Sequence, residues 1–107
     1  MIFIETPQFC AWRERHLDDR TLLALQVRLI ADPDAGDLIR GAHGLRKVRV
    51  PLQGRGKRGG GRVIYYWWSA EDRCYLLYGY AKSARADVTT AQIKRLARAM
   101  TEEMKDG

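Results

Sequence analysis

Residues 44–68 read GLRKVRVPLQGRGKRGGGRVIYYWW, and this stretch decides the fold. Two runs rich in β-branched and aromatic residues, 45–50 and 63–68, flank a glycine-rich segment. This pattern predicts a β-hairpin with a long, solvated connection. In the first run apolar and basic residues alternate, so one face of that strand should meet the core and the other should point outward. We expect the remaining elements to pack around this hairpin.

The net positive charge of the chain is concentrated in the same stretch. The formal net charge of the chain is +6, and no Asp or Glu occurs between residues 38 and 70. The basic residues of the stretch are Arg46, Lys47, Arg49, Arg55, Lys57, Arg58 and Arg62. A fold does not need so many uncompensated cations in one place. The sequence therefore predicts a polyanionic partner, with nucleic acid as the first candidate.

Two further strands are predicted outside the hairpin. Residues 2–5 are short, apolar and β-branched, which is typical of a strand. Residues 75–81, YLLYGYA, follow the hairpin after a short polar connection and should complete a three-stranded meander. Together these segments predict a small, twisted sheet in which antiparallel pairing dominates.

Helices are predicted at both ends of the chain. Thr6 can cap a helix, and Pro7 suits its first turn because the missing N–H is not needed there. Near the C-terminus, Thr89 and Gln92 have the spacing of a capping box. The apolar stripe of the helix that follows should pack on the sheet.

A second N-terminal helix has an unusually wide apolar surface. Asp18 or Asp19 can cap its start, and the Asp-Pro pair at residues 32–33 should stop it. Its apolar residues form two stripes, Leu22, Leu25 and Leu29 in one and Leu23, Val27 and Ile30 in the other. This width predicts a helix clamped between another helix and the sheet. The turn-rich residues 33–44 then lead to the hairpin.

The elements together predict one α+β domain over residues 1–107. It consists of an N-terminal strand, two helices, the three-stranded meander and a C-terminal helix, and the chain length suits a single core. The apolar run at the N-terminus is too short for a signal peptide or a membrane span, so we expect a cytoplasmic protein. Cys10 and Cys74 lack CxxC spacing and are expected to be free thiols, with no metal site.

The glycine-rich segment does not predict a nucleotide cofactor. Gly54, Gly56 and Gly59 match GxGxxG, but the dinucleotide motif opens a helix, whereas a strand is expected here. A phosphate-binding Walker loop needs Ser or Thr after its lysine, and Arg58 follows Lys57. Glycines interleaved with cations suit phosphate contact in another way, because the backbone N–H groups and the arginine forks can both approach an anion.

The residue types present limit the chemistry that this stretch can perform. RNA cleavage needs a base, an acid and cations that stabilise the charge developing on phosphorus. The two histidines, His16 and His43, stand at unrelated positions, and the basic stretch holds no carboxylates for a catalytic metal. Lys, Arg and Tyr chemistry remains, because crowded cations lower the pKa of a lysine and allow it to act as a base. Composition permits such catalysis without demonstrating it.

The order of elements, with GLRKVRV at 44–50, GRGKRGGGRVIYYWW at 54–68 and YLLYGYAK at 75–82, resembles the RelE/ParE superfamily of bacterial toxins. Within it, the sequence is most similar to the host-inhibition-of-growth (HigB-like) branch. The resemblance implies a RelE-like fold and a metal-independent endoribonuclease that cuts translated mRNA on the ribosome and inhibits translation and growth. It implies mRNA, ribosomal RNA and a cognate antitoxin as partners, with no cofactor and no membrane.

The resemblance also implies roles for individual residues. Arg62 matches the arginine that such toxins place against the scissile phosphate, and Lys57 and Lys82 are the candidates for base or charge stabiliser. The expected RNA-binding residues are Lys47 and Arg49 on the strand, Arg55 and Arg58 in the loop, and Tyr80, which could stack on a base or pack in the core. Family nucleases often carry an arginine and a tyrosine where this chain has Ser83 and Thr89, so the general acid stays unassigned unless Arg85 turns inward.

Two alternatives stay open at this point. The gyrase-poisoning (ParE-like) branch shares the fold without cleaving RNA, and a non-catalytic nucleic-acid-binding module would use the basic loop only to grip phosphates. The presence of Lys57, Arg62 and Lys82 favours the nuclease. We expect the antitoxin to cover the basic face or to dock beside the C-terminal helix.

Overall fold

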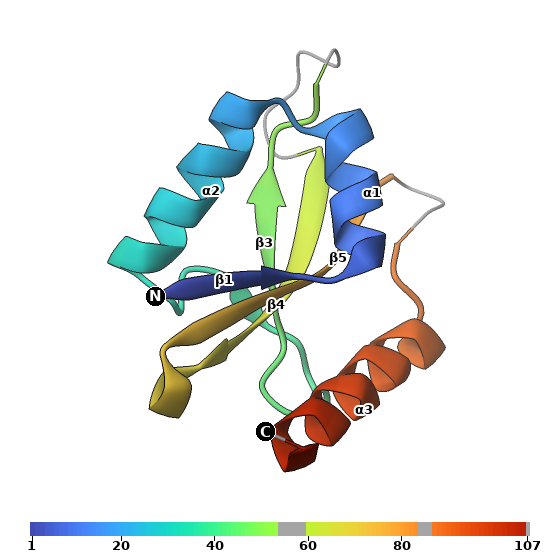
Figure 1. The fold of residues 1–107 in the computed structure, drawn as a ribbon. Helices are drawn as coiled ribbons and strands as arrows, with labels where there is room; N and C mark the ends of the chain where they lie inside the picture. Colours follow the sequence, from blue (N-terminus) through green and yellow to red (C-terminus); the bar gives the residue numbers. More distant parts are fainter. Residues whose placement is uncertain (54–59, 84–86, 107) are drawn as a thin grey trace.

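The computed structural model describes residues 1–53, 60–83 and 87–106, and it confirms the predicted α+β fold (Figure 1). The elements in chain order are β1 (Ile2–Glu5), α1 (Pro7–His16), α2 (Asp19–Ala31), β2 (Asp37–Leu38), β3 (Arg46–Val50), β4 (Gly61–Trp68), a short 3₁₀ turn (Ser69–Glu71), β5 (Arg73–Ala81) and α3 (Thr90–Asp106).

The strands form one five-stranded sheet in the order β1-β5-β4-β3-β2. The meander of β3, β4 and β5 is antiparallel, as predicted, and β1 lies parallel to β5. The sheet also contains β2, a strand that the sequence did not predict. Within residues 33–44, Asp37 pairs with Lys47 and Leu38 with Arg46. Two residues are too few to show the alternation that identifies a strand.

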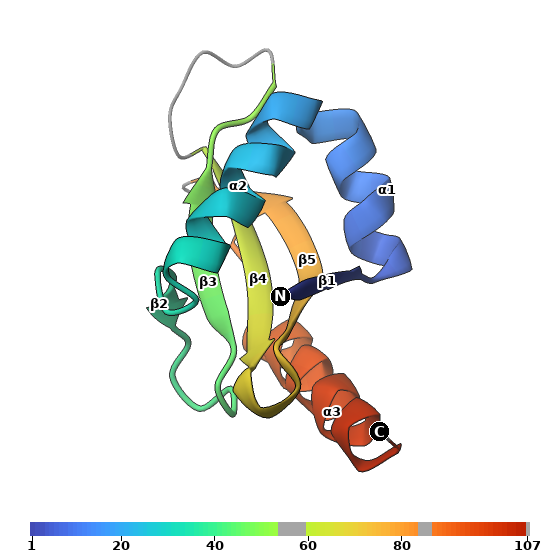
Figure 2. The same cartoon turned by 60° about the vertical axis from the view of Figure 1, so that its left-hand side comes forward.

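Helices α1 and α2 cover one face of the sheet (Figure 2). Phe9 of α1, Leu25 and Leu29 of α2 and Val48 of β3 are buried in the core between them. The predicted caps hold these helices in place. The Thr6 hydroxyl accepts from the Phe9 N–H (3.1 Å) and donates to a carbonyl of β5, while the Asp18 carboxylate caps α2.

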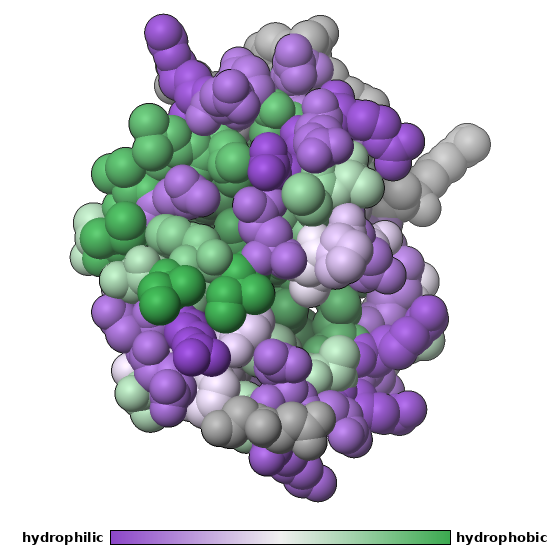
Figure 3. Space-filling view, viewed as in Figure 1, coloured by the Kyte–Doolittle hydropathy of each residue, from purple (hydrophilic) through white to green (hydrophobic). Residues whose placement is uncertain are grey.

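The prediction that α2 is clamped on both sides was wrong. Only the stripe with Leu25 and Leu29 meets the core, whereas Leu23, Val27 and Ile30 keep 60%, 56% and 57% of their surface exposed. The reason is that α1 packs on β5 instead of along the outer side of α2. Figure 3 shows apolar side chains gathered over α2 on this face of the molecule.

Helix α3 packs on the other face of the sheet. Its capping box is formed as predicted, since the Thr89 N–H donates to the Gln92 side chain and the Gln92 N–H to the Thr89 hydroxyl. Ala97 and Met100 of α3 are buried against Ile64 and neighbouring residues of β5. Figure 2 shows α3 toward one end of the sheet, the end farther from the link between α1 and α2. The other end of this face is therefore left without a helix.

Candidate polyanion-binding site

Three predicted site residues lie side by side across the uncovered part of the sheet. The strand register places Arg49 of β3 opposite Arg62 of β4, and Arg62 opposite Tyr80 of β5. Directly opposed residues point to the same face of a sheet. We call Arg49, Arg62 and Tyr80 the cross-strand row. Lys47, two residues before Arg49 on β3, shares its face.

The members of the cross-strand row differ in exposure. Arg49 is exposed, Arg62 is half-buried, and one N–H of its guanidinium donates to the Gly61 carbonyl (3.0 Å). The ring of Tyr80 is half-buried and lies 6.1 Å from the ring of Tyr78, centroid to centroid. Burial first, and then the neighbouring Asp87 carboxylate, raise the pKa of the Tyr80 hydroxyl. The hydroxyl is therefore protonated at neutral pH.

Lys82 lies just beyond the end of β5, beside the cross-strand row. Its backbone N–H donates to the Gly60 carbonyl (3.0 Å), which joins the end of β5 to the start of β4. Its ammonium nitrogen lies 3.7 Å from Oδ2 of Asp87. The described structure thus brings together five of the predicted site residues, namely Lys47, Arg49, Arg62, Tyr80 and Lys82.

Asp87 is the residue of this site that sequence reasoning missed. Its Oδ1 atom accepts from the Val88 N–H (2.8 Å), directly before α3 begins. The Tyr80 hydroxyl first, then the Val88 backbone and the ammonium groups of Lys82 and Lys47, hold the pKa of the Asp87 carboxyl below its usual range. A cavity of about 150 Å³ opens here, lined by Tyr78, Tyr80, Ala81, Asp87, Val88 and Gln92. One acidic residue just before the capping box was the only signal in the sequence.

The other residues and features predicted for the site are not part of this group. Arg55, Lys57, Arg58 and Arg85 lie outside the described residues. Thr89 caps α3 through its hydroxyl, so it has a structural task at the place where family nucleases often have a tyrosine. Among the described residues, the His, Cys, Asp and Glu side chains form no group of three that could hold a metal ion. No helix in the described ranges is long and apolar enough to cross a membrane.

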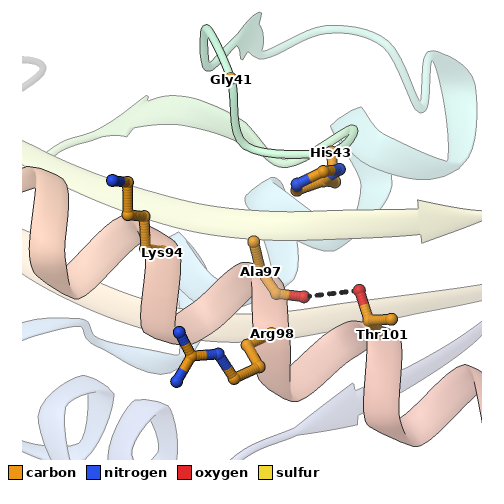
Figure 4. A pocket seen from close by; sticks show the side chains of 6 residues that line it. All are labelled: Gly41, His43, Lys94, Ala97, Arg98 and Thr101. Atoms are coloured by element: carbon orange, nitrogen blue, oxygen red, sulfur yellow. Dashed lines mark hydrogen bonds between the residues drawn. The ribbon is translucent and has the colours of Figure 1, made fainter.

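A second basic region lies between α3 and the turn before β3. A cavity of about 430 Å³ is lined by Gly41, His43, Lys94, Ala97, Arg98 and Thr101. Figure 4 shows that the side chains of Lys94 and Arg98 point in different directions, and that Thr101 bonds to the Ala97 carbonyl (3.0 Å). The two cations of this cavity therefore do not converge on one point.

Cations and a tyrosine on an open sheet face form a surface that can bind a phosphate backbone. The row offers guanidinium groups that grip phosphate oxygens, and Lys82 adds a flexible ammonium group. A family model described as the RelE toxin of the RelE/RelB toxin-antitoxin system matches residues 2–106, which include every strand and helix of the fold. The chain therefore belongs to the RelE toxin family, and it is the toxin of a toxin-antitoxin pair.

Proposed function

We propose that this toxin is a metal-independent endoribonuclease that cleaves mRNA on the translating ribosome. The observation that carries the proposal is the cross-strand row with Lys82 at its end. It combines two guanidinium groups with the ammonium group of Lys82 on the part of the sheet face that α3 leaves uncovered. The partners are mRNA, ribosomal RNA and a cognate antitoxin, and the resemblance of the sequence supports a toxin of the HigB-like branch.

The reaction is an internal transfer at phosphorus. The 2′-oxygen of one nucleotide attacks the adjacent phosphorus and the 5′-oxygen of the next nucleotide leaves, which yields a 2′,3′-cyclic phosphate and a 5′-hydroxyl end. Lys57 of the glycine-rich loop takes the proton of the 2′-hydroxyl, and the ammonium group of Lys82 adds positive charge beside the phosphate. Arg62 stabilises the negative charge that develops on the phosphate oxygens. Neither step requires a metal ion.

The other basic residues hold the RNA in register. Lys47 and Arg49 contact the backbone from β3, and Arg55 and Arg58 do so from the loop. Tyr80 lies opposite Arg62 on the neighbouring strand, and a base of the RNA stacks on its half-buried ring. The general acid that protonates the leaving 5′-oxygen is unassigned, because Ser83 and Thr89 stand where family nucleases often have an arginine and a tyrosine.

The test is induced expression of the wild type and of Arg62→Ala in a bacterial host, with primer extension on an abundant translated message. New wild-type cleavage sites that disappear when translation is blocked, and that are absent with Arg62→Ala, support the proposal. Growth arrest without cleavage would favour a gyrase-poisoning toxin. If expression causes neither growth arrest nor cleavage, the remaining candidate is a module that binds nucleic acid without cutting it.

A further inference from the structure

We propose that Asp87 is a positioning residue for cleavage, which holds the Lys82 ammonium group and the Tyr80 ring in place beside Arg62. This inference rests on the proposed nuclease function. It gives a function to the one carboxylate of the site described here. The ammonium groups of Lys47 and Lys82 both attract this carboxylate electrostatically.

The ion pair with Lys82 does not by itself account for this carboxylate. The ion pair between Lys82 and Asp87 spans 3.7 Å, and the two side chains are 42% and 43% exposed. Exposed pairs of this kind contribute about 0–1 kcal/mol to the free energy of unfolding. A negative charge on a surface that binds a polyanion also weakens that binding. Because the ion pair adds little stability and the negative charge costs affinity, the pairing of Asp87 with Lys82 needs another explanation.

The geometry supplies that reason. The Val88 N–H fixes Oδ1 of Asp87, and the capping box at the start of α3 fixes the backbone beyond Val88. The carboxylate is thus tied to a rigid helix end, and Oδ2 is the atom that faces the ammonium group of Lys82. A lysine has a long flexible stem, so an anchor of this kind limits where its ammonium group can be. Small displacements of a catalytic group cost rate steeply, which makes such an anchor valuable.

Tyr80 completes the arrangement. Its hydroxyl is buried and has no hydrogen-bond partner at normal distance within the described residues. The Asp87 carboxylate lies close enough to be the main polar influence on this hydroxyl. A small approach of the carboxylate lets the hydroxyl donate to it, and buried hydroxyl groups strongly favour such a partner. Asp87 therefore orients the ring that borders Arg62 as well as the lysine.

The variant that tests the proposal is Asp87→Asn, which keeps an oxygen for the Val88 N–H and removes the charge. Asp87→Glu keeps the charge, and Glu71→Gln removes an exposed charge from the 3₁₀ turn between β4 and β5, outside the site. Single-turnover cleavage is measured on ribosomes programmed with a defined mRNA. Affinity is measured with a short single-stranded RNA that carries a 2′-deoxy nucleotide at the cleavage site and cannot react.

We expect Asp87→Asn to lower the cleavage rate constant by about 10- to 100-fold while RNA affinity stays equal or rises. Asp87→Glu should recover most of the rate, and Glu71→Gln should match the wild type. In a Lys82→Ala background, Asp87→Asn should cost clearly less than it does alone, because the two residues act as a unit.

A wild-type rate in Asp87→Asn would overturn the proposal, as would a loss of rate that Asp87→Glu does not reverse. A parallel loss of thermal stability or of RNA affinity would also overturn it, since that would mark a structural or a binding role. A wild-type protein that cuts no RNA in this assay would instead remove the nuclease function, and the role of Asp87 with it. The two failures are therefore distinguishable.

Discussion

Arg49 and Arg62 lie directly opposite each other on β3 and β4. Like charges at facing positions of an antiparallel pair weaken the sheet. Both lie on the part of this face that α3 leaves uncovered, where Arg49 is exposed and Arg62 is half-buried. Two neighbouring guanidinium groups suit a phosphate backbone, and their different exposure separates the expected roles of the two arginines.

Arg62 should be essential for cleavage but not for folding. We expect Arg62→Ala to lower the single-turnover cleavage rate by about 10²- to 10³-fold, because a charge-stabilising donor to the phosphate is lost. Arg62→Lys should recover only part of the rate, since an ammonium group lacks the planar fork. Thermal unfolding of both variants shows whether the fold is intact. A rate close to wild type in Arg62→Ala would contradict the assignment.

Arg49 should contribute to binding instead of chemistry. We expect Arg49→Ala to weaken the binding of single-stranded RNA and to reduce the slope of log K against log salt concentration by about 0.7. The cleavage rate at saturating RNA should change little. Arg15→Ala, which removes an exposed cation from α1, is the matched control. An equal loss of affinity in both variants would mean that only the net charge matters.

The Thr6 hydroxyl joins α1 to the sheet. It accepts from the Phe9 N–H (3.1 Å) and donates to the Leu77 carbonyl (2.7 Å). Thr6→Ala should lower the free energy of unfolding by about 1–2 kcal/mol, because the helix cap and the bond to β5 are lost together. Thr6→Ser keeps both bonds and should cost clearly less. Urea unfolding of the two variants checks this, and equal losses would count against the hydroxyl.

Cys74 should make stability depend on pH in the alkaline range. Burial raises the pKa of its thiol from 9.0 to about 12. The unfolded chain then releases this proton at lower pH than the folded one, so the stabilisation is complete below pH 9 and is lost as the pH rises toward 12. The buried Tyr65 hydroxyl, whose pKa burial also raises, acts in the same direction.

A comparison with Cys74→Ala isolates the thiol. Between pH 9 and pH 10 the wild type should lose roughly 1 kcal/mol more unfolding free energy than the variant does. Urea unfolding at the two pH values measures this difference. Identical losses in the two proteins would show that the thiol ionises equally well in the folded state.

Much of the fold could be predicted because its signals are local. The caps at Thr6, Asp18 and Thr89 are encoded within four residues of sequence, and all three are formed. The meander strands show the alternation that a sheet surface imposes. In contrast, the exposed outer stripe of α2 could not be predicted, because apolar periodicity indicates a face that prefers burial but not whether a neighbour covers it.

The candidate site could be predicted in part. Lys47, Arg49 and Arg62 were found because a run of cations without carboxylates stands out in the sequence. Asp87 was missed because its importance comes from the contact with Lys82, five positions earlier in the chain, and from its effect on the Tyr80 hydroxyl. Such contacts form only after β5 and α3 are packed.

The sequence by itself determined the type and the approximate position of the main elements, and the concentration of charge on the central hairpin, although β4 and β5 each begin two residues earlier than expected. Only the tertiary structure decided that residues 2–5 pair with 73–76, and that Tyr65 spans from β4 to bond the Pro33 carbonyl (2.8 Å) and the Gly36 N–H (2.9 Å). The physical reason is the sequence distance over which the interactions act. Caps and strand periodicity depend on neighbouring residues, whereas these contacts depend on which surfaces remain unburied when the whole chain packs.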